Sequence, residues 1–367
     1  MTALLLQLGL CAALIALAGY QLCLNAERLA ARHGWGRGWV GLALLATVTS
    51  LPELASGLSA VTWVDAPDLA VGHALGACLM NLLFLALVDL LQRNPPLYAG
   101  AATTHALSAA FGGVMLACVA LSLGLGAQAP ALLHLGLYSP LLLLLYLAAL
   151  RSSGADSPPA GVASAEHAAL RFALSALVVL AAGSWLPSLA ERLADLAGWR
   201  QGLVGTLLMA LITTLPEMAV TLAALRLRAL DLALGNLLGS NLFNLLILAL
   251  DDLAYAAGPL LQVAAPSHLG TVLTALLMNA LVLLGLLLKP RARVLRLVSW
   301  VSVGLVAVFG LNAALLYLPL RSEGGKESSG AERTIQSAAI KAQNAAVAQA
   351  TASTRNAECG AFGGRAE

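Results

Sequence analysis

The sequence predicts an all-α integral membrane protein with ten transmembrane helices, arranged as two inverted repeats of five helices each. Three observations lead to this fold class. Of the 367 residues, 60% are hydrophobic and only 10% are charged, whereas a soluble domain carries about 25% charged residues. Long apolar stretches recur along the chain, and its second half repeats the first. The formal net charge is only +2, so the chain lacks the basic surface that a nucleic-acid partner would need.

Ten segments are long enough and apolar enough to cross a bilayer as helices. A hydrocarbon core of roughly 30 Å requires about 20 apolar residues in a helix. The first segment has no positively charged residue before it and is followed by Arg28, so we interpret it as a span and not as a cleavable signal peptide. The predicted spans lie near residues 2–25, 38–62, 68–91, 101–126, 130–150, 168–190, 202–225, 231–257, 268–288 and 294–318.

Composition divides the chain into two halves and a tail. Residues 151–165 are rich in Ser, Pro, Gly and Ala, which predicts a linker. The linker separates a first five-span repeat, residues 1–150, from a second, residues 166–320. Residues 321–367 contain no apolar run long enough to span, and we expect a disordered tail to which we assign no function.

The basic residues predict the orientation of the spans. With the N-terminus outside, the outer connections between spans contain only Arg192 and Arg200. Twelve basic residues then fall on inner connections or on the span ends beside them, as the positive-inside rule requires. The sequence therefore predicts that both termini lie outside. The twelve residues are Arg28, Arg32, Arg37, Arg93, Arg151, Arg171, Arg226, Arg228, Lys289, Arg291, Arg293 and Arg296.

The two halves align with each other in three blocks, the first with ten identities in sixteen positions. A duplication displaced by an odd number of spans turns the second copy upside down relative to the first. Many secondary transporters have such inverted repeats, with the binding site near the midplane where the repeats meet. The aligned blocks are AERLAARHGWGRGWVG (26–41) with AERLADLAGWRQGLVG (190–205), TSLPEL (49–54) with TTLPEM (213–218), and DLAVGHALGACLMNLLFLALVDL (68–90) with DLALGNLLGSNLFNLLILALDDL (231–253).

A glutamate occupies the same position of each copy, well inside an apolar span. An ionisable group at the bilayer centre costs roughly 3 kcal/mol on insertion scales. A single intramembrane glutamate can be a satisfied packing residue, but the matched pair Glu53 and Glu217 indicates a functional site. Each glutamate directly follows a proline, Pro52 or Pro216, which lacks an N–H and frees the carbonyl of the preceding turn.

Hydroxyl side chains precede each glutamate by four and three residues, spacings that share a helix face with the carboxylate. Carboxylates, hydroxyls and freed carbonyls are hard oxygen donors that suit Ca²⁺ or Na⁺, whereas zinc or copper would call for His or Cys. No resident cofactor is expected. The hydroxyl residues are Thr49 and Ser50 in the first copy and Thr213 and Thr214 in the second.

The span after each glutamate adds a polar stripe. Asn236, Ser240 and Asn244 recur at intervals of four, which places amide and hydroxyl oxygens on one helical face. The aligned residues of the first copy are His73, Ala77 and Asn81.

Aspartates lie at both ends of the same spans. Asp68 and Asp231 begin them and are interpreted as N-terminal helix charges or caps. Asp89, Asp251 and Asp252 lie near the far ends. We interpret these three as solvated helix ends, with an access path for ions as the alternative.

These motifs resemble the two α-repeats of sodium/calcium exchangers, within the calcium/cation antiporter superfamily. TSLPEL and TTLPEM are each followed by a Gly-[His/Asn]-x-x-Gly block that continues to an asparagine, and GNLLGSNLFNLL (235–246) is a close match to the family's pattern. The resemblance covers about residues 1–320 and implies a prokaryotic-type member in a bacterial inner or plasma membrane. It also implies that Glu53 and Glu217 are the central cation-binding carboxylates. The residues implied to complete the site are Thr49, Ser50, Thr213, Thr214, Asn81, Ser240 and Asn244.

The first copy departs from the family's pattern. It reads HALGACLMN where the family favours an Asn before the motif and a Ser-Asn within it, so Ala77 cannot ligate through its side chain. Some members also carry an aspartate at one of the positions held here by Asn81 and Asn244. Because Ca²⁺ takes 6–8 oxygen ligands, backbone carbonyls and water would have to fill the shell.

We therefore expect a secondary antiporter that exchanges Ca²⁺ for Na⁺ by alternating access, with inorganic cations as substrates and the lipid bilayer as its surroundings. One alternative keeps the fold but couples Ca²⁺ to H⁺ or K⁺. Another is a transport-inactive membrane assembly or sensing subunit, which the depleted first copy motivates. The sequence contains no GxSxG, HExxH or comparable motif, so an enzyme is not expected.

Overall fold

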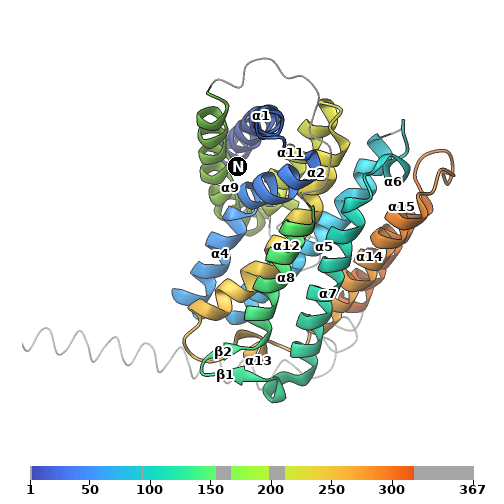
Figure 1. Ribbon diagram of the computed structural model, residues 1–367. Helices are drawn as coiled ribbons and strands as arrows, with labels where there is room; N and C mark the ends of the chain where they lie inside the picture. The colour runs from blue at the N-terminus through green and yellow to red at the C-terminus, as the bar shows by residue number, and fades with distance from the viewer. Residues whose placement is uncertain (1, 93, 154–166, 198–210, 318–367) are drawn as a thin grey trace, which may run out of the picture. The chain divides into compact units, whose positions relative to one another are not determined.

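The computed structural model describes residues 2–92, 94–153, 167–197 and 211–317, most of which are helical (Figure 1). Most of the predicted linker and all of the predicted tail lie outside the described residues. Six described helices are long and apolar enough to cross a membrane, and a bent pair adds a seventh span if it is counted as one. The all-α membrane class is thus confirmed, while the count of ten spans stays a prediction. The six helices are α1 (Thr2–His33), α5 (Pro67–Leu91), α7 (Thr104–Leu125), α9 (Ala168–Ala197), α12 (Leu230–Ala254) and α14 (His268–Leu288).

The bent pair replaces one continuous predicted span. Its first arm consists of α2 (Arg37–Val40), the π-helix η1 (Gly41–Leu45) and α3 (Ala46–Thr49), and its second arm is α4 (Leu51–Thr62). The arms meet at 45°. The remaining elements are α6 (Leu97–Gly100), η2 (Gly126–Gln128), β1 (Ala131–Leu132), β2 (Leu135–Gly136), α8 (Tyr138–Ser152), α11 (Leu215–Arg226), α13 (Leu260–Val263) and α15 (Trp300–Tyr317).

Two predicted spans begin later than the sequence suggested. Residues expected to start the span 130–150 form the antiparallel hairpin β1–β2 instead, and α8 begins only at Tyr138. The hairpin is held because the N–H of Gly136 donates to Asp252 of α12 at 2.9 Å. Similarly, Val294 and Val298 close a tight turn at 2.7 Å, so α15 does not begin until Trp300. Hydrophobicity alone did not reveal either turn, because most of the turn residues are apolar, with His134 and Arg296 as the exceptions.

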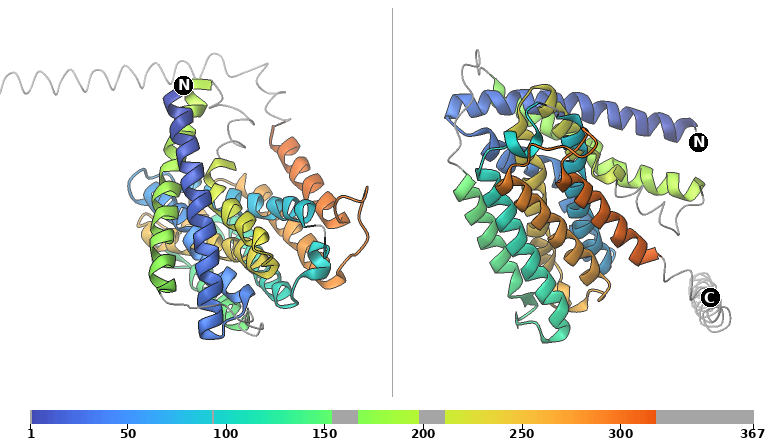
Figure 2. Two further views of the ribbon diagram at one scale, coloured as in Figure 1. Left: turned by 90° about the horizontal axis from the view of Figure 1, so that it is seen from above. Right: turned by 90° about the vertical axis from the view of Figure 1, so that its right-hand side faces the viewer.

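Within the unit Met1–Ala313, α12 is the central helix. The most apolar window of α12 is completely buried, because α4, α5, α7, α8, α11 and η1 all pack against it. By contrast, α1 and α9 lie side by side (Figure 2) and are only 28% buried in the corresponding windows. Leucines such as Leu6 and Leu177 cover their outer faces, 74% and 61% exposed. A buried central helix is therefore accompanied by a pair of helices whose outer faces are apolar and exposed.

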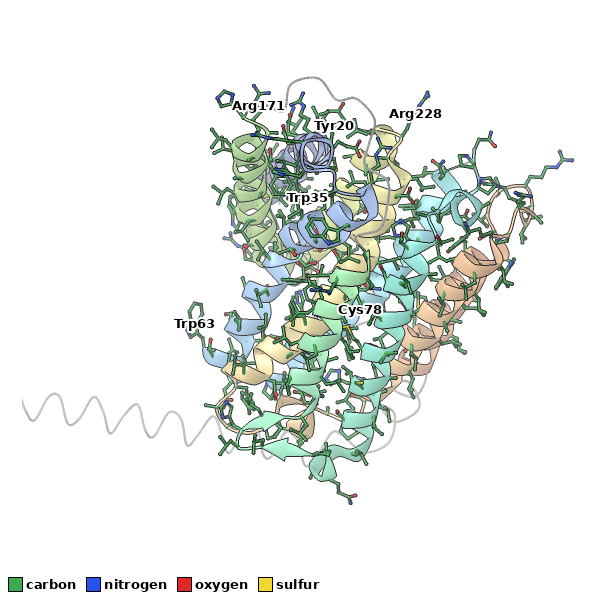
Figure 3. The ribbon with its side chains drawn as sticks, viewed as in Figure 1. Tyr20, Trp35, Trp63, Cys78, Arg171 and Arg228 are labelled. Carbon is green, nitrogen blue, oxygen red and sulfur yellow. The ribbon has the colours of Figure 1, made fainter. Side chains whose placement is uncertain are left out.

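Arg171, Arg228 and Trp63 lie at or next to helix ends. Arg171 and Arg228 project from the same end of the described helices, whereas Trp63 projects from the far end of α4 (Figure 3). Trp63 is 85% exposed, as expected for an aromatic side chain at the membrane–water interface. The orientation of the spans in the membrane stays a prediction.

Candidate cation site

The candidate site lies where two helices are broken at matching positions. Ser50 separates α3 from α4 with φ −95° and ψ 6°, and Thr214 precedes α11 with φ −91° and ψ 12°. Pro52 and Pro216 then occupy the second position of α4 and α11. Proline fits the first turn of a helix but not its interior, so each helix starts anew just before its glutamate.

The two breaks converge on α9. A methyl group built on Gly183 would lie 2.8 Å from Cγ of Pro52 and 3.3 Å from Cγ of Pro216. Only a glycine lets the α9 backbone approach both prolines this closely. The breaks, which are far apart in sequence, are therefore neighbours in space.

Glu53 and Glu217 lie in the first turns of α4 and α11. Both are buried, with 2% and 1% exposure. The first turn of a helix offers unpaired N–H groups and the positive end of the helix dipole, which stabilise a carboxylate. Two buried groups that both carry negative charge when ionised favour a cation or a proton at the site.

Hydroxyl groups of the first copy bond to the second copy. Ser50 Oγ donates to Oε1 of Glu217 at 3.1 Å, and the hydroxyls of Thr49 and Ser240 are 3.3 Å apart. The sequence suggested that Thr49 and Ser50 share a helix face with Glu53 of their own span. The structure differs because the break at Ser50 interrupts that face.

Asn236 of α12 holds the backbone beneath Glu217. Its amide nitrogen donates to the backbone carbonyl of Glu217 at 3.2 Å and to Oγ1 of Thr221 at 3.0 Å. Its amide oxygen accepts a hydrogen bond from Thr49 at 3.5 Å. The polar stripe included Asn236 but not as a candidate ligand, and the structure assigns it a positioning role.

Several buried polar atoms in this region form no hydrogen bond within the described part of the chain. Within the described residues, both carboxylate oxygens of Glu53, Oε2 of Glu217 and the side-chain amides of Asn81 and Asn244 have no hydrogen-bond partner. Buried polar atoms are normally paired. These oxygens are therefore available to a ligand, and their hard character suits Ca²⁺ or Na⁺.

The structure brings only some of the predicted ligands into direct contact. Asn81 and Asn244 are buried on α5 and α12, but no hydrogen bond in the described part of the chain links them to either glutamate. Thr213 and Thr214 are also buried, and Thr214 donates to the carbonyl of Leu211 at 3.4 Å. Among the described residues no cluster of three or more His, Cys, Asp or Glu forms a metal site.

Comparison with known sequences identifies the family. The sequence profile described as "Sodium/calcium exchanger protein" matches residues 3–151 and 167–318. The chain belongs to the sodium/calcium exchanger family. This family consists of membrane antiporters for inorganic cations and not of enzymes, and the chain is accordingly a multi-pass membrane protein.

Individual relatives agree with this assignment. The putative antiporter CaxA of Alkalimonas amylolytica is 29% identical over 225 residues, which cover 56% of this chain and 66% of CaxA. The sodium/calcium exchanger MaX1 of Methanosarcina acetivorans is 46% identical over 63 residues, or 17% of this chain and 18% of MaX1. The matched regions thus span less than two thirds of both relatives.

Solved structures of the sodium-calcium exchanger NCX_Mj have the same fold. One, soaked with Na⁺ and Sr²⁺, gives a TM-score of 0.64 at 22% identity and covers 85% of this chain and 99% of NCX_Mj. Another, soaked without Na⁺ and Ca²⁺, gives 0.64 at 21% identity and covers 87% and 100%.

In this exchanger-family chain, two of the aspartates interpreted as solvated helix ends are buried caps, which corrects that interpretation. Asp89 accepts hydrogen bonds from the N–H of Ser299 at 2.6 Å and from the hydroxyl of Ser302 at 2.7 Å. Asp252 accepts from the hydroxyl of Ser139 at 2.5 Å and from two backbone N–H groups. Asp89 thereby fixes the start of α15, and Asp252 fixes the starts of α8 and α13.

The aspartates at the starts of α5 and α12 each hold the start of another helix as well. Asp231 accepts from the N–H of Ala102 at 2.9 Å, and its Oδ1 is 3.0 Å from Nε2 of His105. Asp68 makes the same pair of contacts with Ala265 and His268, at 2.6 and 3.2 Å. The sequence analysis missed both histidines, although they recur at the same offset as the aspartates.

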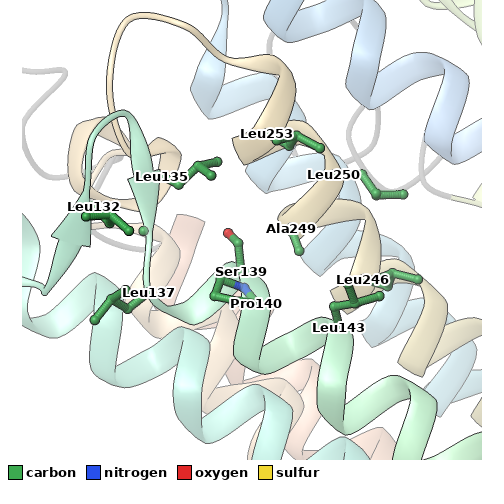
Figure 4. A pocket seen from close by; sticks show the side chains of 11 residues that line it. Leu132, Leu135, Leu137, Ser139, Pro140, Leu143, Leu246, Ala249, Leu250 and Leu253 are labelled. Atoms are coloured by element: carbon green, nitrogen blue, oxygen red, sulfur yellow. The ribbon is translucent and has the colours of Figure 1, made fainter.

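An apolar pocket in the described part of this exchanger-family chain does not suit a cation. It has a volume of about 230 Å³ and lies between the hairpin, α8 and the C-terminal half of α12 (Figure 4). Leucine side chains such as Leu143 and Leu250 dominate its wall, and the hydroxyl of Ser139 is already bonded to Asp252. Such a wall cannot replace the hydration shell of an ion.

Proposed function

We propose that this chain is a secondary active antiporter that exchanges Ca²⁺ for Na⁺ across a membrane by alternating access at a paired-glutamate site. One observation carries the proposal: Glu53 and Glu217 are buried at matching helix breaks, and three of their four carboxylate oxygens have no partner in the described residues. A pocket of charge about −2 binds one Ca²⁺, a few Na⁺ or protons. Because these ions exclude one another, binding at one pocket couples their fluxes.

The proposed ligand set combines both copies. The unpaired oxygens of Glu53, Glu217, Asn81 and Asn244 are its strongest candidates. Ca²⁺ needs 6–8 oxygens, so backbone carbonyls and water complete the shell. The remaining members of the set are Thr49, Ser50, Thr213, Thr214 and Ser240.

The proposed architecture has ten helices in two inverted five-helix repeats, residues 1–150 and 166–320. Alternating access then requires a part that moves. The pair α1 and α9 packs mainly on itself and exposes most of its surface, while Gly183 of α9 rests on the two prolines of the site. Sliding of this pair would uncover the glutamates to one side or the other. A bound ion shifts that equilibrium only through its different affinity for the two states.

The proposed orientation places both termini outside a bacterial inner or plasma membrane. Cys359 belongs to the C-terminal region, whereas Cys11, Cys23 and Cys78 are buried, and the half-buried Cys118 lies within the apolar helix α7. An impermeant thiol reagent added to intact cells should therefore label the wild type but not Cys359→Ser. Labelling that appears only after the cells are opened would reverse the orientation.

Transport of radiolabelled Ca²⁺ into proteoliposomes tests the function. Uptake into sodium-loaded vesicles should be rapid and should not occur when the sodium gradient is replaced by a proton or potassium gradient. Uptake driven only by protons or only by potassium would keep the fold and replace the coupling ion. Silence under all three gradients would favour the transport-inactive subunit.

Charge-neutralising variants test the site. Glu53→Gln and Glu217→Gln should each reduce uptake at least about a hundredfold, because each removes one of two carboxylates that face the ion. Asp65→Asn is the matched control, since Asp65 is an exposed carboxylate between α4 and α5. All variants should purify with the same gel-filtration profile. Wild-type uptake in either glutamate variant would contradict the proposed site.

A further inference from the structure

Asp251 is a buried carboxylate that the proposed exchange site does not use. Its exposure is 0%, and neither of its oxygens has a hydrogen-bond partner in the described residues. The adjacent Asp252 is equally buried but accepts three hydrogen bonds. The hydrogen bonds to neighbouring helix starts therefore explain why Asp252 is a buried carboxylate. No contact of this kind explains why Asp251 is one.

The position of Asp251 connects it with the exchange site. It lies seven residues after Asn244, so it continues the polar face of α12 two turns further along. Its carboxylate lies against Gly57 of α4, where a methyl group would be 2.9 Å from Oδ1 and 3.0 Å from Cγ. Gly57 in turn follows Glu53 by four residues, one helical turn on the same face of α4. Asp251 thus lies between the glutamates and the end at which α4 and α12 terminate.

The duplication does not account for this aspartate. In the alignment of the two copies, Val88 stands opposite Asp251, and Thr221 stands opposite Gly57. The second copy thus has a carboxylate where the first has an apolar side chain. The first copy has a glycine where the second has a hydroxyl that bonds to Asn236. The glycine of the first copy and the aspartate that packs against it thus occur as the pair Gly57 and Asp251. The aligned residues, Thr221 and Val88, include neither a glycine nor an acid.

The surroundings of Asp251 suit a proton better than a metal ion. Ca²⁺ and Na⁺ need several oxygen ligands, but Asp251 receives no hydrogen bond from a described hydroxyl or amide, and its closest contact is the glycine. Without a nearby cation, the neutral acid is the stable form of a carboxyl group in such a place. No hydrogen bond or ion pair joins it to another described titratable group. On the helices around it these groups are Glu53 of α4, Asp68, His73 and Asp89 of α5, Tyr138, Tyr146 and Arg151 of α8, and Asp231 and Asp252 of α12.

We propose that Asp251 is a proton-binding site on the path between the paired glutamates and the membrane face at which α4 ends, and that it releases its proton when a cation enters this path. The inference rests on the proposed cation exchange. A cation approaching Glu53 stabilises the ionised form of a carboxylate one turn away. The O–H bond of Asp251 then breaks, the proton leaves to water on that face, and the carboxylate attracts the ion. When the cation departs, the acid takes a proton back.

The number of protons released per bound Ca²⁺ tests this role. Purified wild-type protein in weakly buffered detergent solution is titrated with Ca²⁺ at neutral pH while a pH indicator reports the protons. Asp251→Asn should bind Ca²⁺ and release about one proton fewer per ion, because linkage counts each coupled proton. The thermal midpoint of this variant should stay the same or rise, since an unpaired buried acid has been removed.

Asp252→Asn is the matched control on the same helix. It should lower the thermal midpoint, because three hydrogen bonds lose a charged acceptor, but it should leave the proton count unchanged. If it does not fold, the exposed Asp65→Asn replaces it. An unchanged count in Asp251→Asn would overturn the proposal and leave Asp251 as a neutral packing residue. A changed sodium dependence with an unchanged proton count would overturn it in favour of a sodium site. Failure of the wild type to bind Ca²⁺ would instead contradict the proposed exchange.

Discussion

The two copies of the glutamate motif share a backbone frame but surround their carboxylates differently. Ser50 and Thr214 have nearly the same φ and ψ, and each is followed by a proline and a buried glutamate. Glu217, however, accepts a hydrogen bond from Ser50 at 3.1 Å, whereas Glu53 has no partner for either oxygen in the described residues. The two copies thus have the same backbone conformation but differ in the hydrogen bonding of the glutamate carboxylate.

The cause of the difference lies in the neighbouring helices. On α12, Asn236 donates to the backbone of Glu217, and Ser240 pairs with Thr49. On α5, the aligned residues are His73 and Ala77, and neither side chain forms a hydrogen bond in the described part of the chain. We infer that hydrogen bonds hold the carboxylate of Glu217 in one position, whereas the carboxylate of Glu53 can change its position when an ion binds.

Among the variants that test the difference between the two copies, the largest effect is expected from the loss of the hydrogen bond between Ser50 and Glu217. Ser50→Ala removes a hydrogen bond to a charged group, worth about 1.5–3 kcal/mol. The Ca²⁺ concentration for half-maximal uptake should therefore rise at least about tenfold, since about 1.4 kcal/mol corresponds to a factor of ten. Calcium titration of uptake into sodium-loaded vesicles measures the shift.

Ser56→Ala is the control for this prediction. Its hydroxyl also lies on the glutamate-bearing span, but it bonds only to the backbone carbonyl of Pro52 one turn earlier. Its loss should change half-maximal calcium by less than about twofold. Equal effects of the two substitutions would mean that Ser50 does not hold Glu217.

The sequence predicts the burial of the two glutamates at the candidate cation site better than the contacts around them. Glu53, Glu217 and the prolines before them could be found because duplication makes an intramembrane acid conspicuous. The bond from Ser50 to Glu217 could not be found, since it depends on how two distant helix breaks meet at Gly183. Residue spacing describes one helix at a time, whereas this contact joins two.

The aspartates show a different limit of sequence reasoning. Near the ends of apolar runs, Asp89 and Asp252 have the pattern of solvated helix ends, yet both are buried caps of other helices. Burial there depends on turns such as β1–β2, whose apolar residues are indistinguishable from a span. His105 and His268 could have been found, because they recur at the spacing of the two copies.

A smaller effect is expected from exchanging one hydroxyl between the copies. Ser240→Ala removes an oxygen and the partner of Thr49, while Ala77→Ser adds a hydroxyl at the aligned position of α5. A hydrogen bond or ligand contact of this kind contributes about 0.5–1.5 kcal/mol. Half-maximal calcium should thus rise by about threefold in the first variant and fall by a similar factor in the second.

The combined variant sharpens this result. Ala77→Ser with Ser240→Ala moves the hydroxyl from one copy to the other without changing the number of oxygens. If the copies contribute equivalent ligands, uptake should return close to the wild-type calcium dependence. If half-maximal calcium is instead as high as in Ser240→Ala alone, the hydroxyl acts by holding Thr49 and not as a ligand.

The smallest effect on transport, and a measurable one on stability, is expected at Asp68 and Asp231, the aspartates that begin α5 and α12. Asp231 is 32% exposed and its partner His105 only 2%, whereas Asp68 is 57% and His268 15% exposed. Solvent weakens the more exposed pair. Asp231→Asn should therefore cost about 1 kcal/mol of stability and Asp68→Asn a few tenths, because a neutral acceptor forms a hydrogen bond about half as strong. Thermal unfolding in detergent compares the two, and uptake should stay within about twofold of the wild type.

A double-mutant cycle decides whether the histidine contact causes the difference. If Asp231 stabilises the start of α7 through His105, then Asp231→Asn should destabilise a His105→Gln background less than it destabilises the wild type. If it acts through the N–H of Ala102 alone, the two losses should be equal. The same cycle at Asp68 and His268 should show a smaller coupling, since water competes for that pair. If the coupling energies of the Asp231–His105 and Asp68–His268 pairs are equal, burial is not the reason why the two pairs contribute differently to stability.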